Sequence, residues 1–237
     1  MKKIAVVTGA GSGVGRACAI RLANEGYAVA VLSRREPTLH ETIALANESA
    51  RKNMLAIPCD IGDEPAVADM ARKVLARFEQ VDVLINAAGT NTAERSLAQL
   101  SSANYHDMMG ANMHGAYYCV QAFLRGMRER KRGDIIVINS LAGRRASELS
   151  GVAYSMSKFA AAGLVQSINA EENKNGIRAC SIFPGDIHTP LLDKRAIPPS
   201  QDARQKMLTP DDVTDCVMLA LKLPDRAVVE EIVVRPR

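Results

Sequence analysis

Short apolar, β-branched runs alternate with longer amphipathic stretches along the whole chain. The runs predict strands at Ile4–Thr8, Ala28–Leu32, Met54–Pro58, Val81–Asn86, Ile135–Ser140, Ile177–Phe183 and Val228–Val234. Apolar residues recur at helical spacing in Val14–Glu25, Glu64–Arg77, Tyr105–Arg130, Tyr154–Asn173 and Pro210–Leu221. Because strands that alternate with helices form parallel sheets covered on both faces, we expect a three-layer α/β fold around a seven-stranded parallel sheet.

Length and composition favour a single domain over residues 1–237. The chain has 237 residues, 47% of them hydrophobic, which is enough to bury a large core. Its most irregular stretch is 189–207, which contains three prolines among charged residues. Loops of this length in compact domains usually have a function, so we expect 189–207 to cover a substrate site. A plain surface loop is the alternative.

Charge and cysteine content exclude several classes of protein. The net charge is +4, but the basic residues are dispersed and aromatic residues make up only 4%, so we expect no nucleic-acid binding. The five cysteines lie far apart with no CxxC pair and no nearby histidine, which predicts reduced thiols and no metal site. The first apolar run is too short for a signal peptide, and no run is long enough to span a membrane. We therefore expect a cytoplasmic protein.

A glycine-rich loop follows the first predicted strand and precedes a predicted helix. Its sequence is Thr8-Gly9-Ala10-Gly11-Ser12-Gly13-Val14-Gly15. Glycines let the backbone turn tightly and approach a pyrophosphate, whose charge is met by the free N–H groups at the start of the helix. The spacing is GxxxGxG rather than GxGxxG, because Arg16 stands where a third glycine would be. The loop predicts a dinucleotide site; a turn that serves only helix packing is the alternative.

The end of the second predicted strand indicates which dinucleotide is bound. Folds that prefer NAD usually have Asp or Glu there to hold the adenosine ribose, whereas this chain has Ser33-Arg34-Arg35. A hydroxyl and a guanidinium can donate charge-assisted hydrogen bonds to a 2′-phosphate. We therefore expect NADP(H) rather than NAD(H), although Arg34 and Arg35 could instead be solvated charges at the start of a helix.

Tyr154 and Lys158 lie one helical turn apart and can share one site. A free tyrosine has a pKa of about 10, and a nearby ammonium favours the phenolate, so this pairing could make tyrosine a usable acid or base. Ser140 ends a buried-looking strand, at the edge where parallel sheets bind ligands. The YxxxK pattern alone would equally suit a surface pair.

These features occur together in the order found in one family. Thr8–Gly15, Asn86-Ala87-Ala88-Gly89, Asn112, Ser140, Tyr154, Lys158 and Pro184-Gly185 resemble the single-domain type of the short-chain dehydrogenase/reductase family over nearly the whole chain. The resemblance implies a Rossmann-like fold and hydride transfer between a nicotinamide and a small carbonyl or alcohol substrate. It also implies a homotetramer or homodimer built through the two long helices after the fourth and fifth strands.

The resemblance also implies a role for each residue of the site. Tyr154 would protonate the carbonyl oxygen in reduction, and Ser140 would hydrogen-bond the same oxygen. Lys158 would hold the nicotinamide ribose and lower the pKa of Tyr154, and Asn112 would anchor a water that links the lysine to solvent. The expected cofactor contacts are Gly9, Gly11, Ser12, Gly13, Val14, Gly15, Ser33, Arg34, Asp60, Ile61, Asn86, Ala87, Gly89, Tyr154, Lys158, Pro184, Gly185, Ile187 and Thr189. For Asp60 and Asn86–Gly89, strand-end turns and caps are the alternative.

Other functions and contacts stay open from the sequence. A dinucleotide-binding redox sensor without turnover would usually lack the tyrosine or lysine, and an epimerase or lyase would need a longer substrate region. An NAD-dependent alcohol or hydroxy-acid dehydrogenase is a further alternative. Arg144 and Arg145 could attract an acidic substrate, be solvated or pair at a subunit interface, and His188 is more simply a polar loop residue.

Overall fold

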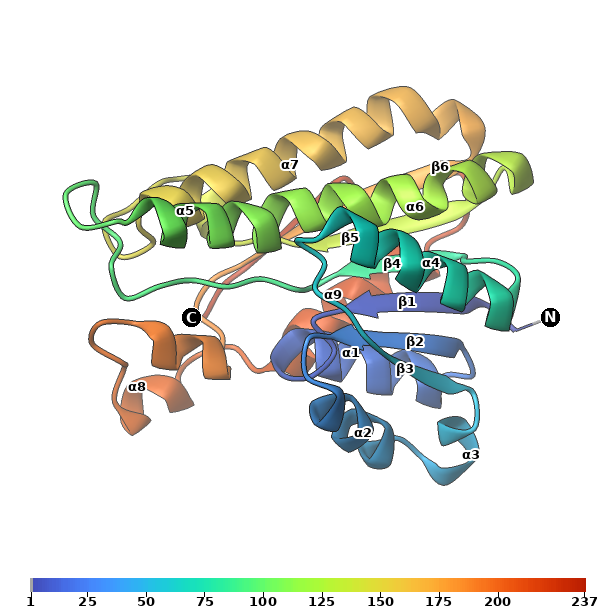
Figure 1. Cartoon of the computed structure of the whole chain (residues 1–237), viewed down its shortest axis with the longest axis horizontal. Coiled ribbons are helices and arrows are strands. Elements are labelled where there is room, and N and C mark those ends of the chain that lie inside the picture. The colour runs from blue at the N-terminus through green and yellow to red at the C-terminus, as the bar shows by residue number, and fades with distance from the viewer. Residues whose placement is uncertain (1) are drawn as a thin grey trace.

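The computed structural model describes residues 2–237, and a seven-stranded parallel sheet lies at its centre (Figure 1). The strands are β1 Ile4–Thr8, β2 Ala28–Ser33, β3 Met54–Pro58, β4 Val83–Asn86, β5 Gly133–Ile138, β6 Ile177–Pro184 and β7 Glu231–Val234. They are ordered β3-β2-β1-β4-β5-β6-β7, and each neighbouring pair is parallel. The predicted seven-stranded parallel sheet is confirmed.

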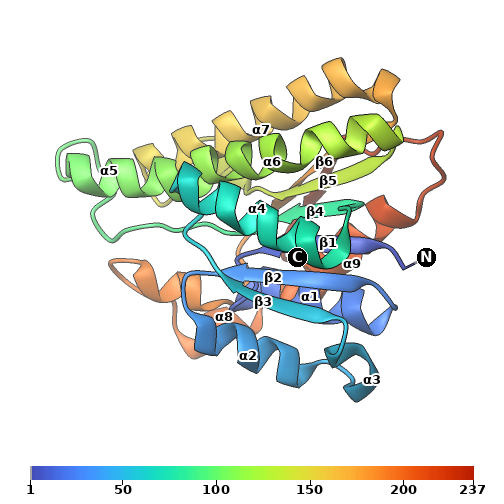
Figure 2. The ribbon, with the colours of Figure 1, turned by 45° about the vertical axis from the view of Figure 1, so that its right-hand side comes forward.

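Helices cover both faces of this sheet, as two views of the ribbon show (Figures 1 and 2). One face carries α1 Gly13–Asn24, α2 Glu36–Leu45, α3 Glu48–Arg51 and α9 Pro210–Lys222. The other carries α4 Glu64–Phe78, α6 Gly115–Arg130 and α7 Val152–Glu172. The expected three-layer Rossmann-like arrangement is therefore confirmed.

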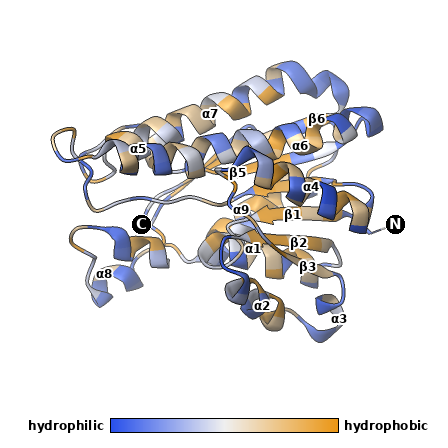
Figure 3. Ribbon diagram, viewed as in Figure 1, coloured by the Kyte–Doolittle hydropathy of each residue, from blue (hydrophilic) through white to orange (hydrophobic). Residues whose placement is uncertain are grey.

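The core consists of two apolar layers, one on each side of the sheet. Successive side chains of a strand point to opposite faces, so Val7 packs under α1 and α9 whereas Val6 packs under the opposite helices. Most side chains of the strands are buried apolar residues, and the outer helix surfaces are more polar (Figure 3). This is the pattern of a parallel sheet buried on both faces.

The helix predicted over Tyr105–Arg130 is in fact interrupted. It consists of α5 Ser102–Met109, a π-helical turn over Gly110–His114, and α6. At Gly115 an added Cβ would lie 2.5 Å from Ile61 Cγ1, so the chain packs closely where the π turn ends. π turns are frequent at functional sites, and this one contains Asn112. Apolar periodicity cannot reveal such an insertion.

Two further regions hold helices that the sequence did not predict. α2 presents only Leu39 and Thr42 as buried residues, so its apolar period is weak. The stretch 189–207 contains a 3-10 helix at Pro190–Lys194 and the short α8 Gln201–Gln205. Figure 1 shows α8 beyond the carboxyl ends of the strands. Within the described residues 2–237, no helix is both long and apolar enough to cross a membrane.

Candidate active site

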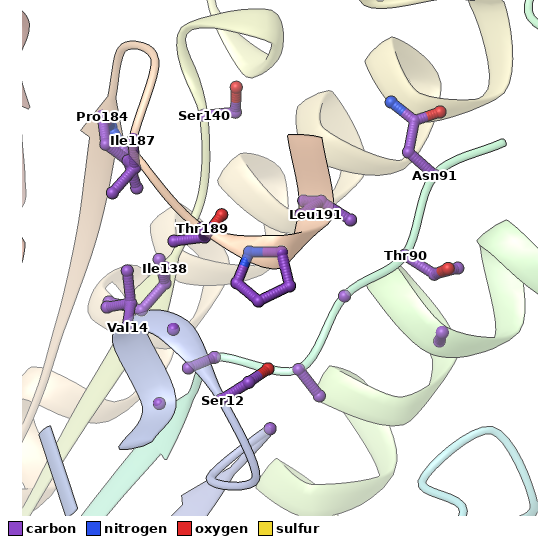
Figure 4. A pocket seen from close by; sticks show the side chains of 18 of the residues that line it. Ser12, Val14, Thr90, Asn91, Ile138, Ser140, Pro184, Ile187, Thr189 and Leu191 are labelled. Atoms are coloured by element: carbon purple, nitrogen blue, oxygen red, sulfur yellow. The ribbon is translucent and has the colours of Figure 1, made fainter. Parts of the chain in front are cut away.

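A cavity of about 840 Å³ opens at the carboxyl edge of the sheet. β1 lies between β2 and β4, and the chain leaves β1 for one face and β4 for the other, which is where open α/β sheets bind ligands. In the close view, Ser12 and Val14 lie below the cavity and Ser140 above it (Figure 4). Thr90 and Asn91 lie across it from Pro184 and Ile187.

Most of the residues predicted for the site line this one cavity. They are Gly9, Gly11, Ser12, Gly13, Val14, Gly15, Ser33, Arg34, Asp60, Ile61, Ala87, Gly89, Ser140, Tyr154, Lys158, Pro184, Gly185, Ile187 and Thr189. Two predicted residues do not line it, because Asn86 and Asn112 are buried behind the wall, with 4% and 3% of their surface exposed. The Asn86 amide donates to the Ala116 carbonyl at 3.3 Å.

Glycines are required where the loop after β1 meets its neighbours. Gly9 has φ +67°, and an added Cβ would lie 2.7 Å from the backbone of Ala88. At Gly15 an added Cβ would lie 2.4 Å from the carbonyl oxygen of Gly9. The loop is therefore held against the chain after β4, and α1 begins directly above β1.

Thr8 also joins the ends of β1 and β4. Its buried Oγ1 accepts hydrogen bonds from the backbone N–H groups of Ala87 and Ala88, both at 3.1 Å. This contact fixes the two loops on which a dinucleotide would lie. The sequence placed Thr8 in the loop motif but gave no signal for this role, since the partner is 79 positions away.

The end of β2 presents a hydroxyl and a cation to the cavity. Ser33 Oγ donates to the Arg35 carbonyl at 3.1 Å and lies 3.3 Å from Thr38 Oγ1. Arg34 is 60% exposed, and its Nη1 lies 4.0 Å from the Asp60 carboxylate, which is 54% exposed. A pair this open and this long contributes little to stability, so Arg34 is available to a ligand.

Tyr154, Ser140 and Lys158 meet at the opposite end of the cavity. Tyr154 lies in the first turn of α7, which places Lys158 one turn further along the same face. Lys158 Nζ lies 5.6 Å from the centre of the Tyr154 ring and donates to the Ile138 carbonyl at 2.9 Å. Ser140 follows β5, and its backbone N–H donates to the Asn139 side chain at 3.0 Å.

Burial controls the acidity of both titratable groups. It raises the pKa of Tyr154 above its ordinary value, and this is opposed by a hydrogen bond with Ser140 and by the charges of Arg95 and Arg195. Burial also lowers the pKa of Lys158 to about 8. A lowering of the Tyr154 pKa by Lys158 stays a prediction.

Asn112 fastens the loop after β4 from behind. Its Oδ1 accepts from the Thr90 N–H at 2.7 Å, and its Nδ2 donates to the Thr90 carbonyl at 3.0 Å and to Ser157 Oγ at 3.1 Å. Both amide hydrogens are therefore used within the protein. The water that the resemblance implies would therefore have to donate to the Oδ1 atom of Asn112 or contact the main chain of this residue.

Arg34, predicted for the cofactor, lines the cavity, but the pair that the sequence suggested for an acidic substrate does not. Arg144 pairs with Glu231 at 2.5 Å, and neither Arg144, Arg145 nor His188 is among the lining residues. Arg95 and Arg195 line the cavity instead. No motif marks them; the only signal is that each lies in a loop that follows a strand of a parallel sheet. Across residues 2–237, no group of three His, Cys, Asp or Glu is arranged to hold a metal ion.

Comparison with known proteins places the chain in a family. A profile described as short chain dehydrogenase matches residues 3–198. An uncharacterised oxidoreductase of Staphylococcus aureus (strain MW2) is 33% identical over 99% of this chain and 97% of its own length. The chain belongs to the short-chain dehydrogenase family and is an oxidoreductase of that family.

Solved structures agree with this assignment. An alcohol dehydrogenase from the archaeon Thermococcus sibiricus, complexed with 5-hydroxy-NADP, has a TM-score of 0.85 and 30% identity, covering 100% of this chain and 97% of its own. A closed form of serine dehydrogenase complexed with NADP+ has a TM-score of 0.88 and 25% identity, covering 98% and 94% respectively. A nicotinamide dinucleotide is thus the cofactor class of this fold.

Proposed function

We propose that the chain is an NADP(H)-dependent oxidoreductase that interconverts a small carbonyl compound and its alcohol, with Tyr154 as the acid and base. The observation that carries the proposal is the common cavity in which Ser140, Tyr154 and Lys158 face the glycine loop. Ser140 and Tyr154 both offer a hydroxyl to one carbonyl oxygen, as an acid and an orienting donor must. The nicotinamide, when bound, supplies or accepts the hydride.

The residues at the other end of the cavity fit a dinucleotide. Gly9 and Gly15 allow the close backbone packing that holds the loop in place, and an added Cβ at Gly13 would lie 3.2 Å from Thr189 Cγ2 in the cavity lining, so the glycine there leaves room for a pyrophosphate to approach the backbone. Ser12 caps α1 without a side-chain hydrogen bond, which leaves its hydroxyl and the first N–H groups of the helix available. Ser33 and Arg34 would hold the 2′-phosphate, and Asp60, Ile61, Ala87 and Gly89 would hold the adenosine.

Tyr154 would give its hydroxyl proton to the substrate oxygen in reduction and take it back in oxidation. Ser140 would orient that oxygen. Lys158 would hold the ribose hydroxyls with its ammonium, and Pro184, Gly185, Ile187 and Thr189 would contact the nicotinamide. Asn112 would position Thr90 and Ser157 behind the site rather than touch the substrate.

Fluorescence titration with NADPH and NADH tests the cofactor preference. Tighter binding of NADPH that Arg34→Ala reduces is expected, because the variant removes a donor to the 2′-phosphate. Equal affinity for the two cofactors, or tighter NADH binding, would contradict the NADP(H) assignment and favour an NAD-dependent dehydrogenase.

Turnover of a panel of ketones, aldehydes and hydroxy acids tests the chemistry. Tyr154→Phe should bind NADPH normally and lose nearly all activity, since it retains the ring and lacks the proton. Undiminished activity in that variant would refute the acid–base role. NADPH binding without turnover of any compound by the unmodified protein would instead favour a sensor.

We also propose one cytoplasmic domain over 1–237, with 189–207 as a cover over the substrate. Leu192 in this segment is buried and lines the cavity, which supports such a cover. A homotetramer or homodimer through α6 and α7 is supported by Tyr117, Met156 and Phe159, which are 44%, 46% and 46% exposed on these helices. Light scattering tests the oligomeric state, and a monomer would contradict it.

A further inference from the structure

Arg95 is held in the wall of the cavity by backbone carbonyls from three segments. Its Nε donates to the Thr92 carbonyl and its Nη1 to the Leu149 carbonyl, both at 2.6 Å, and its Nη2 donates to the Lys194 carbonyl at 3.3 Å. A guanidinium has more N–H donors than these bonds use, and the spare ones lie on the terminal nitrogens. The side chain is therefore fixed in position and still able to bind a ligand.

The charge of Arg95 is not neutralised by the protein. All of its hydrogen bonds go to uncharged carbonyls, and within residues 2–237 it forms no ion pair. It is only partly exposed, and burial and the charge of Arg195 lower its pKa. Because no carboxylate of the described residues neutralises this half-buried guanidinium, it has room for an anion from outside the chain.

A second arginine adds to the positive charge near Tyr154. Arg195 has 17% of its side chain exposed, lines the same cavity and pairs with Asp186 at 2.5 Å. Asp60, the other acidic residue of the lining, lies beside Arg34 near the end of β2. At the Tyr154 end, Arg95, Arg195 and Lys158 thus face a single carboxylate. The charges of both arginines favour the Tyr154 phenolate, which places them near the reacting hydroxyl.

We infer that the substrate carries a carboxylate, which Arg95 binds while the carbonyl of the same molecule lies against Tyr154 and Ser140. One guanidinium matches one negative charge, and Leu149, Leu191 and Leu192 in the lining suit a short aliphatic chain between the two groups. The inference rests on the proposed function and narrows its substrate from small carbonyl compounds to oxo acids. Reduction breaks the C=O π bond: the carbon receives hydride from NADPH, which is oxidised, the oxygen receives the Tyr154 proton, and the carboxylate is unchanged.

Matched acids and esters separate this role from a purely structural one. We would compare kcat/KM for pyruvate, acetoacetate and levulinate with the values for their methyl esters, which keep the carbonyl and lose the charge. At least one acid should exceed its ester by about ten- to a hundredfold, the range of one charge-assisted hydrogen bond. Arg95→Gln should remove that preference by lowering only the value for the acid.

Two further variants are the controls. Arg95→Lys cannot hold three carbonyls in the same way, but it keeps the positive charge. It should therefore keep much of the preference for the acid over the ester. Arg144→Gln removes an arginine that lies outside the cavity and should leave both values unchanged. If both Arg95→Lys and Arg95→Gln lowered kcat/KM equally for the acid and the ester, Arg95 would only stabilise the local structure, and the inference would be overturned.

A binding measurement keeps this inference distinct from the proposed function. Ligand-observed NMR of acetoacetate with the protein and NADP+ should detect binding that Arg95→Gln abolishes. Binding of this kind without turnover would support the carboxylate site while the proposed function fails. If an ester were turned over in a Tyr154-dependent reaction and no acid had a higher kcat/KM than its ester, the inference would be overturned and the proposed function would stand. Absence of both binding and preference would also overturn it.

Discussion

Replacing Asn112 by alanine should destabilise the protein severely, although Asn112 lies outside the cavity. The side chain makes three hydrogen bonds, to Thr90 N–H, Thr90 carbonyl and Ser157 Oγ, and is 3% exposed. At about 1 kcal/mol for each bond, the free energy of unfolding should fall by about 3 kcal/mol. For a chain of this size that corresponds to a fall in Tm of about 6–12 °C.

Thermal unfolding followed by circular dichroism measures this change. Asn112→Asp keeps the acceptor for the Thr90 N–H but sets an oxygen against the Thr90 carbonyl, so it should also be destabilised. The control is Asn104→Ala on α5, whose exposed amide donates to Glu94 at 3.1 Å and should change Tm by less than about 2 °C. A Tm of Asn112→Ala as close to the parent as that of the control would refute the reasoning.

Three other outcomes are expected. Gly15→Ala puts a Cβ 2.4 Å from the Gly9 carbonyl oxygen and should weaken NADPH binding at least about tenfold, whereas Gly126→Ala should not change it; titration by NADPH fluorescence measures both. The pKa of Lys158 is about 8. If the ammonium holds the cofactor, binding at about pH 8.5 should take up protons and weaken at higher pH, which calorimetry in buffers of different ionisation enthalpy detects and Lys158→Met should abolish. Burial raises the pKa of three thiols to about 12, so a thiol reagent should label Cys216 first in the native protein and all five cysteines after denaturation.

The order of strands and helices could be predicted from the sequence because apolar runs and helical periods are local signals. The glycine loop was predicted because its motif is local, whereas Ser140, Tyr154 and Lys158 were assigned to one site through the resemblance to a family. The glycines of the loop and these three residues line one cavity. The π turn at Asn112 was missed because one inserted residue leaves the apolar pattern almost unchanged.

The residues that the sequence could not identify act through distant partners. Thr8 contacts a loop 79 positions away, and Arg95 contacts carbonyls 54 and 99 positions away. Thr8 belongs to the glycine-loop motif, but nothing in that motif indicates its distant partner; Arg95 belongs to no motif, and arginines are most often solvated surface residues. The sequence suggested Arg144 and Arg145, not Arg95, as possible contacts to an acidic substrate, and only the folded chain separates arginines that line the cavity from those that do not.

The carbonyls that hold Arg95 have a consequence for engineering this scaffold. The Arg95 side chain joins three segments of the chain, because it donates to the carbonyls of Thr92, Leu149 and Lys194. An added Cβ at Gly151, just before α7, would lie 2.6 Å from Arg95 Cβ. A loop transplanted from a relative into any one of these segments would therefore disturb the other two and the start of the helix that carries Tyr154. Substrate range in this protein should be altered by exchanging the three segments together, as one cassette.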